Sequence, residues 1–196
     1  MKQKKLTAGI IFSLFFALLL ILLAPEDKTL GPILKLVYLH GALIFTGLLL
    51  FLAVGLLGLR SLFSKGQSFS LLFSIERTAI IFWVAATIIG DITSVLAWGG
   101  LNWSEPRFNA TIIISLVSIS VYLISTAMDD PRIISVLGIG LAVSVWALMI
   151  SSGKIMHPDN PFGNSEPSIR FFFGIITFVF LISSILAVSW MVEKEM

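Results

Sequence analysis

Six long apolar stretches dominate this sequence and constrain the fold more than any other feature. Each has about the 20 residues that an α-helix needs to cross the hydrocarbon core of a bilayer. They span residues 6–24, 37–59, 78–98, 110–127, 133–151 and 171–192. Because 57% of the 196 residues are hydrophobic and only 12% are charged, a water-soluble fold of this length could not bury the apolar side chains. We therefore predict an all-α, polytopic membrane protein whose six transmembrane helices form a single domain over residues 1–196.

The charges between the stretches predict the orientation of the chain in the membrane. With a cytoplasmic N-terminus, eight of the 13 Lys and Arg residues fall on cytoplasmic segments and five fall outside, as the positive-inside rule favours. An even number of spans then places the C-terminus in the cytoplasm as well. We expect a multi-pass protein of the plasma membrane with three extracytoplasmic loops, at residues 25–36, 99–109 and 152–170. The first stretch has no small-residue cleavage pattern, so we expect a retained helix and not a signal peptide.

The two cytoplasmic connections differ in character. Residues 128–132 predict a tight turn, in which Pro131 suits the first turn of the next helix and Asp129 or Asp130 can cap that helix. The connection at 60–77 is longer and contains the apolar segment 69–73. This segment either lies at the membrane interface as an amphipathic element or packs under the bundle as a plain connection.

The composition excludes several kinds of site. The absence of cysteine removes disulfides, thiolate metal sites, iron–sulfur clusters and covalent haem attachment. The sequence contains no phosphate-binding loop, nucleophile elbow or dinucleotide-binding fingerprint, and its charges do not form the broad basic face of a nucleic-acid-binding protein. We therefore expect none of these sites, and no nucleic-acid-binding protein.

The chain has only two histidines, and the topology places both on the extracytoplasmic side. His40 lies about one turn inside the second apolar stretch, and His157 lies a few residues beyond the fifth. Neutral imidazole is a good axial ligand for haem iron, and two imidazoles can hold one iron from opposite faces. The alternative is that His40 bonds a neighbouring carbonyl and that His157 is a solvated residue of its loop. The nearby acidic residues have no zinc-site spacing.

The loop between the third and fourth stretches gathers side chains suited to a flat, anionic ligand. Trp98 and Trp103 can pack against an apolar ring system, and Gly99 lets the backbone approach such a ligand closely. Arg107, in the run Glu105-Pro106-Arg107, can pair with an anionic group such as a haem propionate. An interfacial aromatic belt would account for Trp98 but not for the acid–proline–arginine run.

Together these features resemble the CcmC and CcsA family of haem-handling proteins in cytochrome c maturation, and CcmC most closely. Tyr38-Leu39-His40 is similar to the family's Tyr-Ile-His segment, and His157 stands where the family has its second histidine. The segments Trp98-Gly99 and Glu105-Pro106-Arg107 match the two ends of the tryptophan-rich WWD motif with the spacing kept. The central tryptophans of that motif fall on Leu101, Asn102 and Ser104, with Trp103 one place off, and its aspartate is replaced by Glu105.

The resemblance implies a protein that transiently holds haem b at the outer membrane surface and presents it to a haem chaperone. His40 and His157 would be the axial ligands of the iron, and Trp98, Gly99, Trp103, Glu105 and Arg107 would line the haem. The expected partners are a CcmE-like haem chaperone and CcmA- and CcmB-like subunits of an ABC transporter.

Two other functions remain open from the residues themselves. Paired histidines also occur in cytochrome b-type electron-transfer subunits of membranes, usually deep in facing helices. Asp91, in the third stretch, is a carboxyl group at bilayer depth, where a charge costs about 2.5–3.5 kcal/mol. It could serve as the proton relay of a small transporter or as a partner for Arg107.

Overall fold

The computed structural model describes residues 2–63, 69–153 and 165–195. These residues form six helices, each long and apolar enough to cross a membrane, so the all-α fold with six transmembrane helices is confirmed. The helices are α1 (Lys2–Leu23), α2 (Leu34–Phe63), α3 (Ser70–Trp98), α4 (Pro106–Thr126), α5 (Pro131–Ser151) and α6 (Pro167–Glu195).

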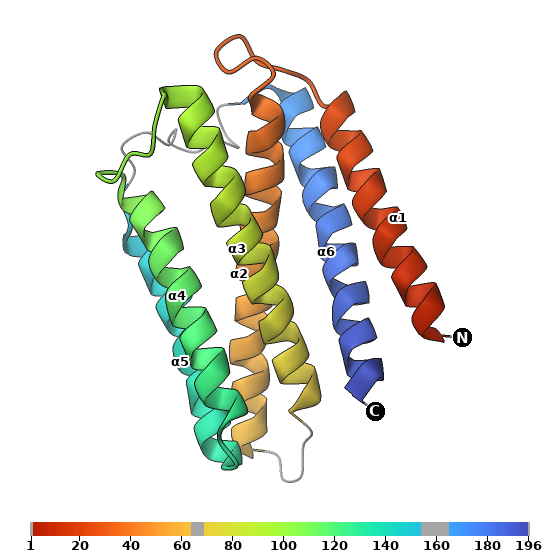
Figure 1. Cartoon of the computed structure of the whole chain (residues 1–196), viewed down its shortest axis with the longest axis vertical. Helices are drawn as coiled ribbons and strands as arrows, with labels where there is room; N and C mark the ends of the chain where they lie inside the picture. The colour runs from red at the N-terminus through yellow and green to blue at the C-terminus, as the bar shows by residue number, and fades with distance from the viewer. Residues whose placement is uncertain (1, 64–68, 154–164, 196) are drawn as a thin grey trace.

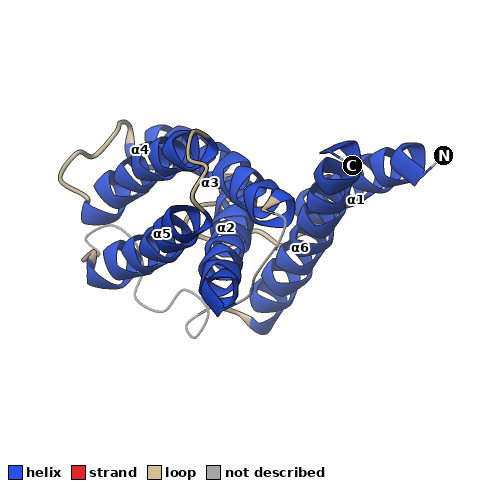
Figure 2. Ribbon diagram, turned by 90° about the horizontal axis from the view of Figure 1, so that it is seen from below, coloured by secondary structure: helices blue, strands red, loops and turns tan. Residues whose placement is uncertain are grey.

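The helices run roughly antiparallel to one another and give the bundle two distinct ends (Figure 1). We call the end that carries the α1–α2 and α3–α4 connections the His40 end, and the end that carries both chain termini and the α4–α5 connection the terminal end. The view from the terminal end shows α2 among α3, α5 and α6, with α1 outermost against α6 (Figure 2). Which end faces the cytoplasm stays a prediction from the charges.

Helix α2 approaches α5 closely because glycines replace side chains at their contact. A Cβ on Gly58 would lie 2.8 Å from the carbonyl oxygen of Ser135, and one on Gly55 would lie 2.5 Å from the Cβ of Ala142. Small residues of this kind let the backbones of membrane helices approach each other and gain van der Waals contact. The largest fully buried side chain, Trp83 of α3, packs edge-on against Phe51 of α2, with ring centroids 5.8 Å apart.

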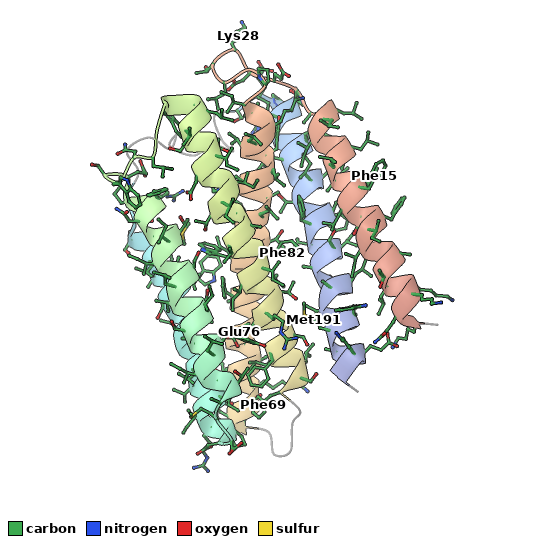
Figure 3. The ribbon with its side chains drawn as sticks, in the orientation of Figure 1. Phe15, Lys28, Phe69, Glu76, Phe82 and Met191 are labelled. Atoms are coloured by element: carbon green, nitrogen blue, oxygen red, sulfur yellow. The ribbon has the colours of Figure 1, made fainter. Side chains whose placement is uncertain are left out.

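Helix α1 joins the bundle chiefly through α6. The Ser183 hydroxyl donates a hydrogen bond of 2.8 Å to the Ser13 hydroxyl across this interface, while Phe15 points outward (Figure 3). At its C-terminal end, α1 is held by Lys35, whose ammonium group donates to the carbonyl oxygens of Leu22 and Ala24. A cation there satisfies carbonyl groups that the helix itself leaves without partners.

Most helix ends lie close to where the sequence predicts them, with one important exception. At the start of α5, Asp130 accepts a hydrogen bond from the backbone N–H of Arg132, as predicted. Helices α2, α4 and α6 begin at Leu34, Pro106 and Pro167, a few residues before the predicted starts. The connections that precede them are therefore shorter than expected. Helix α3 begins at Ser70 and not at residue 78, because the apolar segment 69–73 continues into the helix instead of forming a separate interfacial element.

Candidate functional site

His40 points from α2 toward α3, and its hydrogen bond defines which ring nitrogen carries the proton. The Nδ1 atom lies 2.8 Å from the carbonyl oxygen of Ala86. A carbonyl oxygen can only accept, so Nδ1 is the donor, and a neutral imidazole then has its lone pair on Nε2. Histidine ligands of metals commonly hold their second nitrogen in this way, which fixes the tautomer and the ring orientation. The chemistry of His40 therefore fits an axial ligand that coordinates iron through Nε2.

Gly90 makes this position of the His40 ring possible. A Cβ on Gly90 would lie 2.7 Å from Cε1 and 2.8 Å from Nδ1 of His40, closer than carbon atoms pack without displacement. The sequence analysis gave Gly90 no role. A glycine inside an apolar helical stretch is the one signal that could have pointed to close packing.

The α3–α4 connection begins with a turn that depends on Gly99. This residue has a φ of 79°, in the left-handed region that favours glycine, and its N–H bonds the carbonyl oxygen of Val95 at 3.0 Å. The turn leaves Trp98 46% and Trp103 64% exposed at the His40 end. Trp103 packs edge-on against Phe108, with ring centroids 5.0 Å apart. The connection thus presents two aromatic surfaces, one of which is held in place by α4.

Glu105 and Arg107 flank Pro106 at the start of α4 and have different environments. Glu105 occupies the N-cap position but is only 3% exposed, and its side chain does not cap the helix. The Nε atom of Arg107 is buried and has no hydrogen-bond partner in the described part of the chain. A cation in the first turn opposes the positive end of the helix dipole, so the helix itself gives no reason for Arg107. An anionic ligand would.

One of the two roles considered for Asp91, a pairing with Arg107, is not seen among the ion pairs of the described residues. The two ion pairs among the described residues are Lys2 with Glu193 and Lys35 with Glu26. Asp91 is half-buried in α3. The structure therefore gives Asp91 no partner among the described residues.

The structure brings some of the predicted site residues together and leaves others apart. A Cβ on Gly153 would lie 3.8 Å from Cγ of Pro106, so the start of the α5–α6 connection meets the start of α4. His157 follows four residues later in the sequence but lies outside the described residues. On α3, Gly90 precedes Trp98 by eight residues, about 12 Å along the helix. Trp98 thus lies about two helical turns beyond the contact of Gly90 with His40, toward the same end of the bundle.

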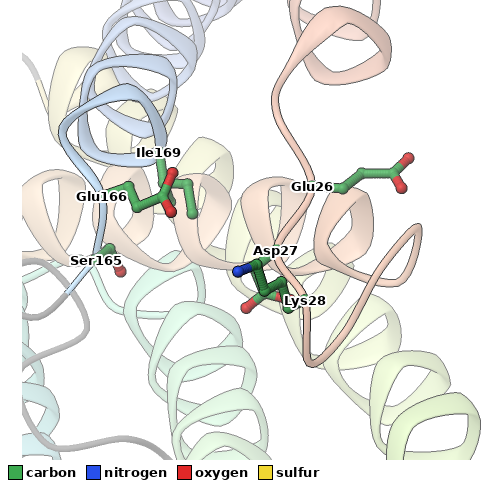
Figure 4. A pocket seen from close by; sticks show the side chains of 6 residues that line it. All are labelled: Glu26, Asp27, Lys28, Ser165, Glu166 and Ile169. Carbon is green, nitrogen blue, oxygen red and sulfur yellow. The ribbon is translucent and has the colours of Figure 1, made fainter.

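A separate hollow opens at the same end, between the α1–α2 connection and the start of α6 (Figure 4). Its volume is about 390 Å³. The residues that line it are Glu26, Asp27, Lys28, Ser165, Glu166 and Ile169. Three carboxyl groups against one ammonium group disfavour an anionic porphyrin. Nor does the described part of the chain contain a group of three His, Cys, Asp or Glu side chains that could hold a metal ion.

Glu76 is a buried residue that was not predicted, because the hydrophobic pattern places it in the connection before the third apolar stretch. In the structure this residue lies within α3, its side chain is 0% exposed, and neither carboxyl oxygen has a hydrogen-bond partner among the described residues (Figure 3). Its helical spacing from Leu72, Ala79 and Trp83, all of them buried, places the four side chains on one face. That spacing was the signal that could have shown it to be buried.

The fold defines the class of this protein as a polytopic α-helical membrane protein. Within that class, neither the scan of protein-family models nor the search of curated proteins finds a match for this chain.

Proposed function

We propose that this protein binds haem b transiently at the His40 end of the bundle and presents it to a haem chaperone for cytochrome c assembly. The observation that carries the proposal is the hydrogen bond from Nδ1 of His40 to Ala86, because it leaves the lone pair of a neutral imidazole on Nε2. His157, the chain's other histidine, is the proposed second axial ligand.

The surface beside His40 supports a porphyrin as the ligand. Trp98 and Trp103 are exposed, and indole rings can pack against the flat apolar face of a haem. Arg107 offers a guanidinium group whose Nε has no partner in the described residues, which suits pairing with a propionate. Gly99 and Glu105 complete the proposed lining through the turn and the start of α4.

The rest of the proposal rests on the resemblance of the sequence to the CcmC and CcsA proteins. The haem would be handed to a CcmE-like chaperone, beside CcmA- and CcmB-like subunits of an ABC transporter. The protein would reside in the plasma membrane with its His40 end outside. It would bind and release haem without catalysing a reaction, so we propose that it is not an enzyme.

The experiment is purification of the protein with haem supplied, followed by absorption spectroscopy. We expect the spectrum of an iron with two imidazole ligands in the wild type and its loss in His40→Ala and in His157→Ala. Imidazole added to His40→Ala should restore the spectrum, because the small molecule can occupy the vacated ligand position. Asp91→Asn is the matched control and should bind haem normally. An unchanged spectrum in both histidine variants would refute the proposal.

The same preparation separates the two alternative functions. A haem that is not transferred to a chaperone but exchanges electrons rapidly with a quinone would indicate a cytochrome b-type subunit. Substrate uptake that Asp91→Asn abolishes, in a protein that binds no haem, would indicate a transporter.

A further inference from the structure

The carboxyl group of Glu76 is buried inside the membrane-spanning bundle and has no polar partner among the residues that the structure describes. The side chain is 0% exposed, and neither of its oxygens accepts or donates a hydrogen bond within the described residues. Neither ion pair of the described residues involves it. Transfer of a polar group from water to such an environment costs several kcal/mol when no hydrogen bond compensates, and a charged group costs far more. The carboxyl group is therefore stable only as the neutral acid or with a bound cation.

The surroundings of Glu76 favour a proton over a metal ion as that cation. Metal cations that prefer oxygen take about six oxygen ligands in proteins, and the described residues contain no cluster of three candidate metal-binding side chains. Two hydroxyl groups lie two residues away in the sequence, and neither bonds Glu76. That of Ser74 has no hydrogen-bond partner among the described residues, and that of Thr78 donates to the carbonyl oxygen of Ser74 at 2.7 Å. A lone carboxyl group without further oxygen ligands suits a proton.

Few other titratable or charged groups lie on the helices around Glu76. Within α3, Arg77 follows it directly, but its Nε donates to the Tyr122 hydroxyl of α4 at 2.9 Å. Elsewhere on these helices, the charged residues toward the terminal end lie within a few positions of a helix end: Arg60 of α2, Arg132 of α5, and Glu193 and Lys194 of α6. Between those ends, Tyr122 is the only titratable side chain in the terminal half of the neighbouring helices. Within the described residues, these helices thus place no further acid or base beside Glu76 to share its proton.

The depth of Glu76 decides from which side a proton can reach it. Glu76 is six residues from the start of α3 at Ser70, about 9 Å along the helix. Helix α3 has 29 residues and is about 43 Å long, whereas the hydrocarbon core of a bilayer is about 30 Å thick. The helix is thus longer than the core is thick, and its first residues lie outside the core. The carboxyl group therefore lies just inside the hydrocarbon boundary. On its other side, Ala79 and Trp83 fill the same helix face and are fully buried.

We propose that Glu76 is a proton-binding site inside the bundle and that it exchanges its proton with solution at the terminal end. The site is independent of the proposed haem site, which lies at the opposite end. The closed packing seen around Glu76 is the protonated state, and loss of the proton requires water to enter between α3 and its neighbours.

The proposal can be tested on the whole purified protein in micelles with dicyclohexylcarbodiimide, an apolar reagent for protonated carboxyl groups. The acid proton moves to one nitrogen of the reagent and the carboxyl oxygen bonds to its central carbon; the acyl group then migrates to nitrogen, giving a stable N-acylurea. Nothing is oxidised or reduced, and the product carries the added mass of one reagent molecule. We expect mass spectrometry to find this mass on the peptide that contains Glu76, and labelling to fall as the pH is raised.

Three outcomes would overturn the proposal. Absence of label on Glu76 at every pH would mean that the carboxyl group does not hold a proton. Labelling independent of pH would mean that the proton is trapped and does not exchange. Protection by sodium chloride, but not by choline chloride, would identify a metal-cation site instead.

Variants and a second measurement separate this site from the other acidic groups. Glu76→Gln keeps the shape of the neutral acid and should lose the label, whereas Asp91→Asn should keep it. Infrared spectroscopy of the wild type should show a neutral carboxylic acid band that disappears reversibly at alkaline pH. A band that persists until the protein unfolds would contradict exchange. Because labelling of the wild-type peptide that contains Glu76 needs no variant, it decides the proposal even if Glu76→Gln does not fold.

Discussion

Gly90→Ala adds one methyl group at the point where the His40 ring meets α3. The new carbon would lie 2.7 Å from Cε1 and 2.8 Å from Nδ1 of His40, so either the ring or the helix must move. Forcing an extra carbon into a packed site costs about 1–3 kcal/mol. Alanine in turn favours the helix over glycine by about 1 kcal/mol. If the ring swings away, the hydrogen bond to Ala86 is lost, at about 1 kcal/mol. Together these effects give an expected net loss of about 1–3 kcal/mol in the free energy of unfolding.

The assay is unfolding of the purified protein in mixed micelles, followed by tryptophan fluorescence, together with a haem titration. Gly140→Ala is the matched control, because a Cβ on Gly140 would meet no atom within 4 Å; it should leave stability unchanged or slightly raise it. A displaced imidazole should also weaken haem binding by about tenfold, the lower range seen when a partner of a metal-binding histidine is removed.

A double-mutant cycle tests the assigned cause. Removing the ring with His40→Ala should make Gly90→Ala harmless, because the methyl group then has room. If Gly90→Ala costs the same with and without His40, or behaves like Gly140→Ala in both backgrounds, the reasoning about this contact is refuted.

Three further substitutions test the packing of the bundle in the same unfolding assay. Gly58→Ala should lower the free energy of unfolding by about 1–3 kcal/mol. The new Cβ would lie 2.8 Å from a backbone oxygen of α5, and a backbone atom cannot easily move. An unaltered stability would contradict the close approach of the two helices. Ser183→Ala should weaken the association of α1 with α6 by about 0.6 kcal/mol. The control is Ser189→Ala, which should be neutral because the Ser189 hydroxyl bonds only within α6. Equal effects of the two substitutions would argue against the interhelical bond. Trp83→Phe removes the indole N–H that donates to the carbonyl oxygen of Thr111. Loss of this bond should lower the free energy of unfolding by about 1 kcal/mol, in addition to the effect of lost packing. A loss of less than about 1 kcal/mol would show the bond to be weak.

Sequence reasoning predicts the six helices because hydrophobic length is a local property. It also predicts the start of α5, where Asp130 caps the helix and Pro131 opens it, since both residues act on their immediate neighbours. It fails at the start of α3, because Glu76 reads as the polar edge of a connection. The charge alone cannot reveal that Leu72 and Trp83 bring this side chain into the interior. The spacing of Glu76 from Leu72, Ala79 and Trp83 carries this information, but only once residues 70–77 are recognised as part of the helix.

In the candidate site, too, the sequence predicts the features that depend on neighbouring residues and not the contacts between helices. The turn at Gly99 and the exposure of Trp98 and Trp103 follow from residues within one connection. The contact of His40 with Ala86 and Gly90 joins residues 46 or more positions apart in the chain, and no local pattern encodes it. Close helix–helix contacts of this kind depend on the register in which two helices pack, which a single sequence does not specify.

The pairing of α1 with α6 has a consequence for biosynthesis. Their interhelical hydrogen bond joins residues 170 positions apart. The first of the six helices therefore cannot contact its main partner until the last helix has been synthesised. At about 5–20 residues per second, roughly 10–30 s separate the synthesis of the two serines. During that interval α1 has lipid or the insertion machinery as its neighbour, and the bundle matures only when α6 arrives to join it.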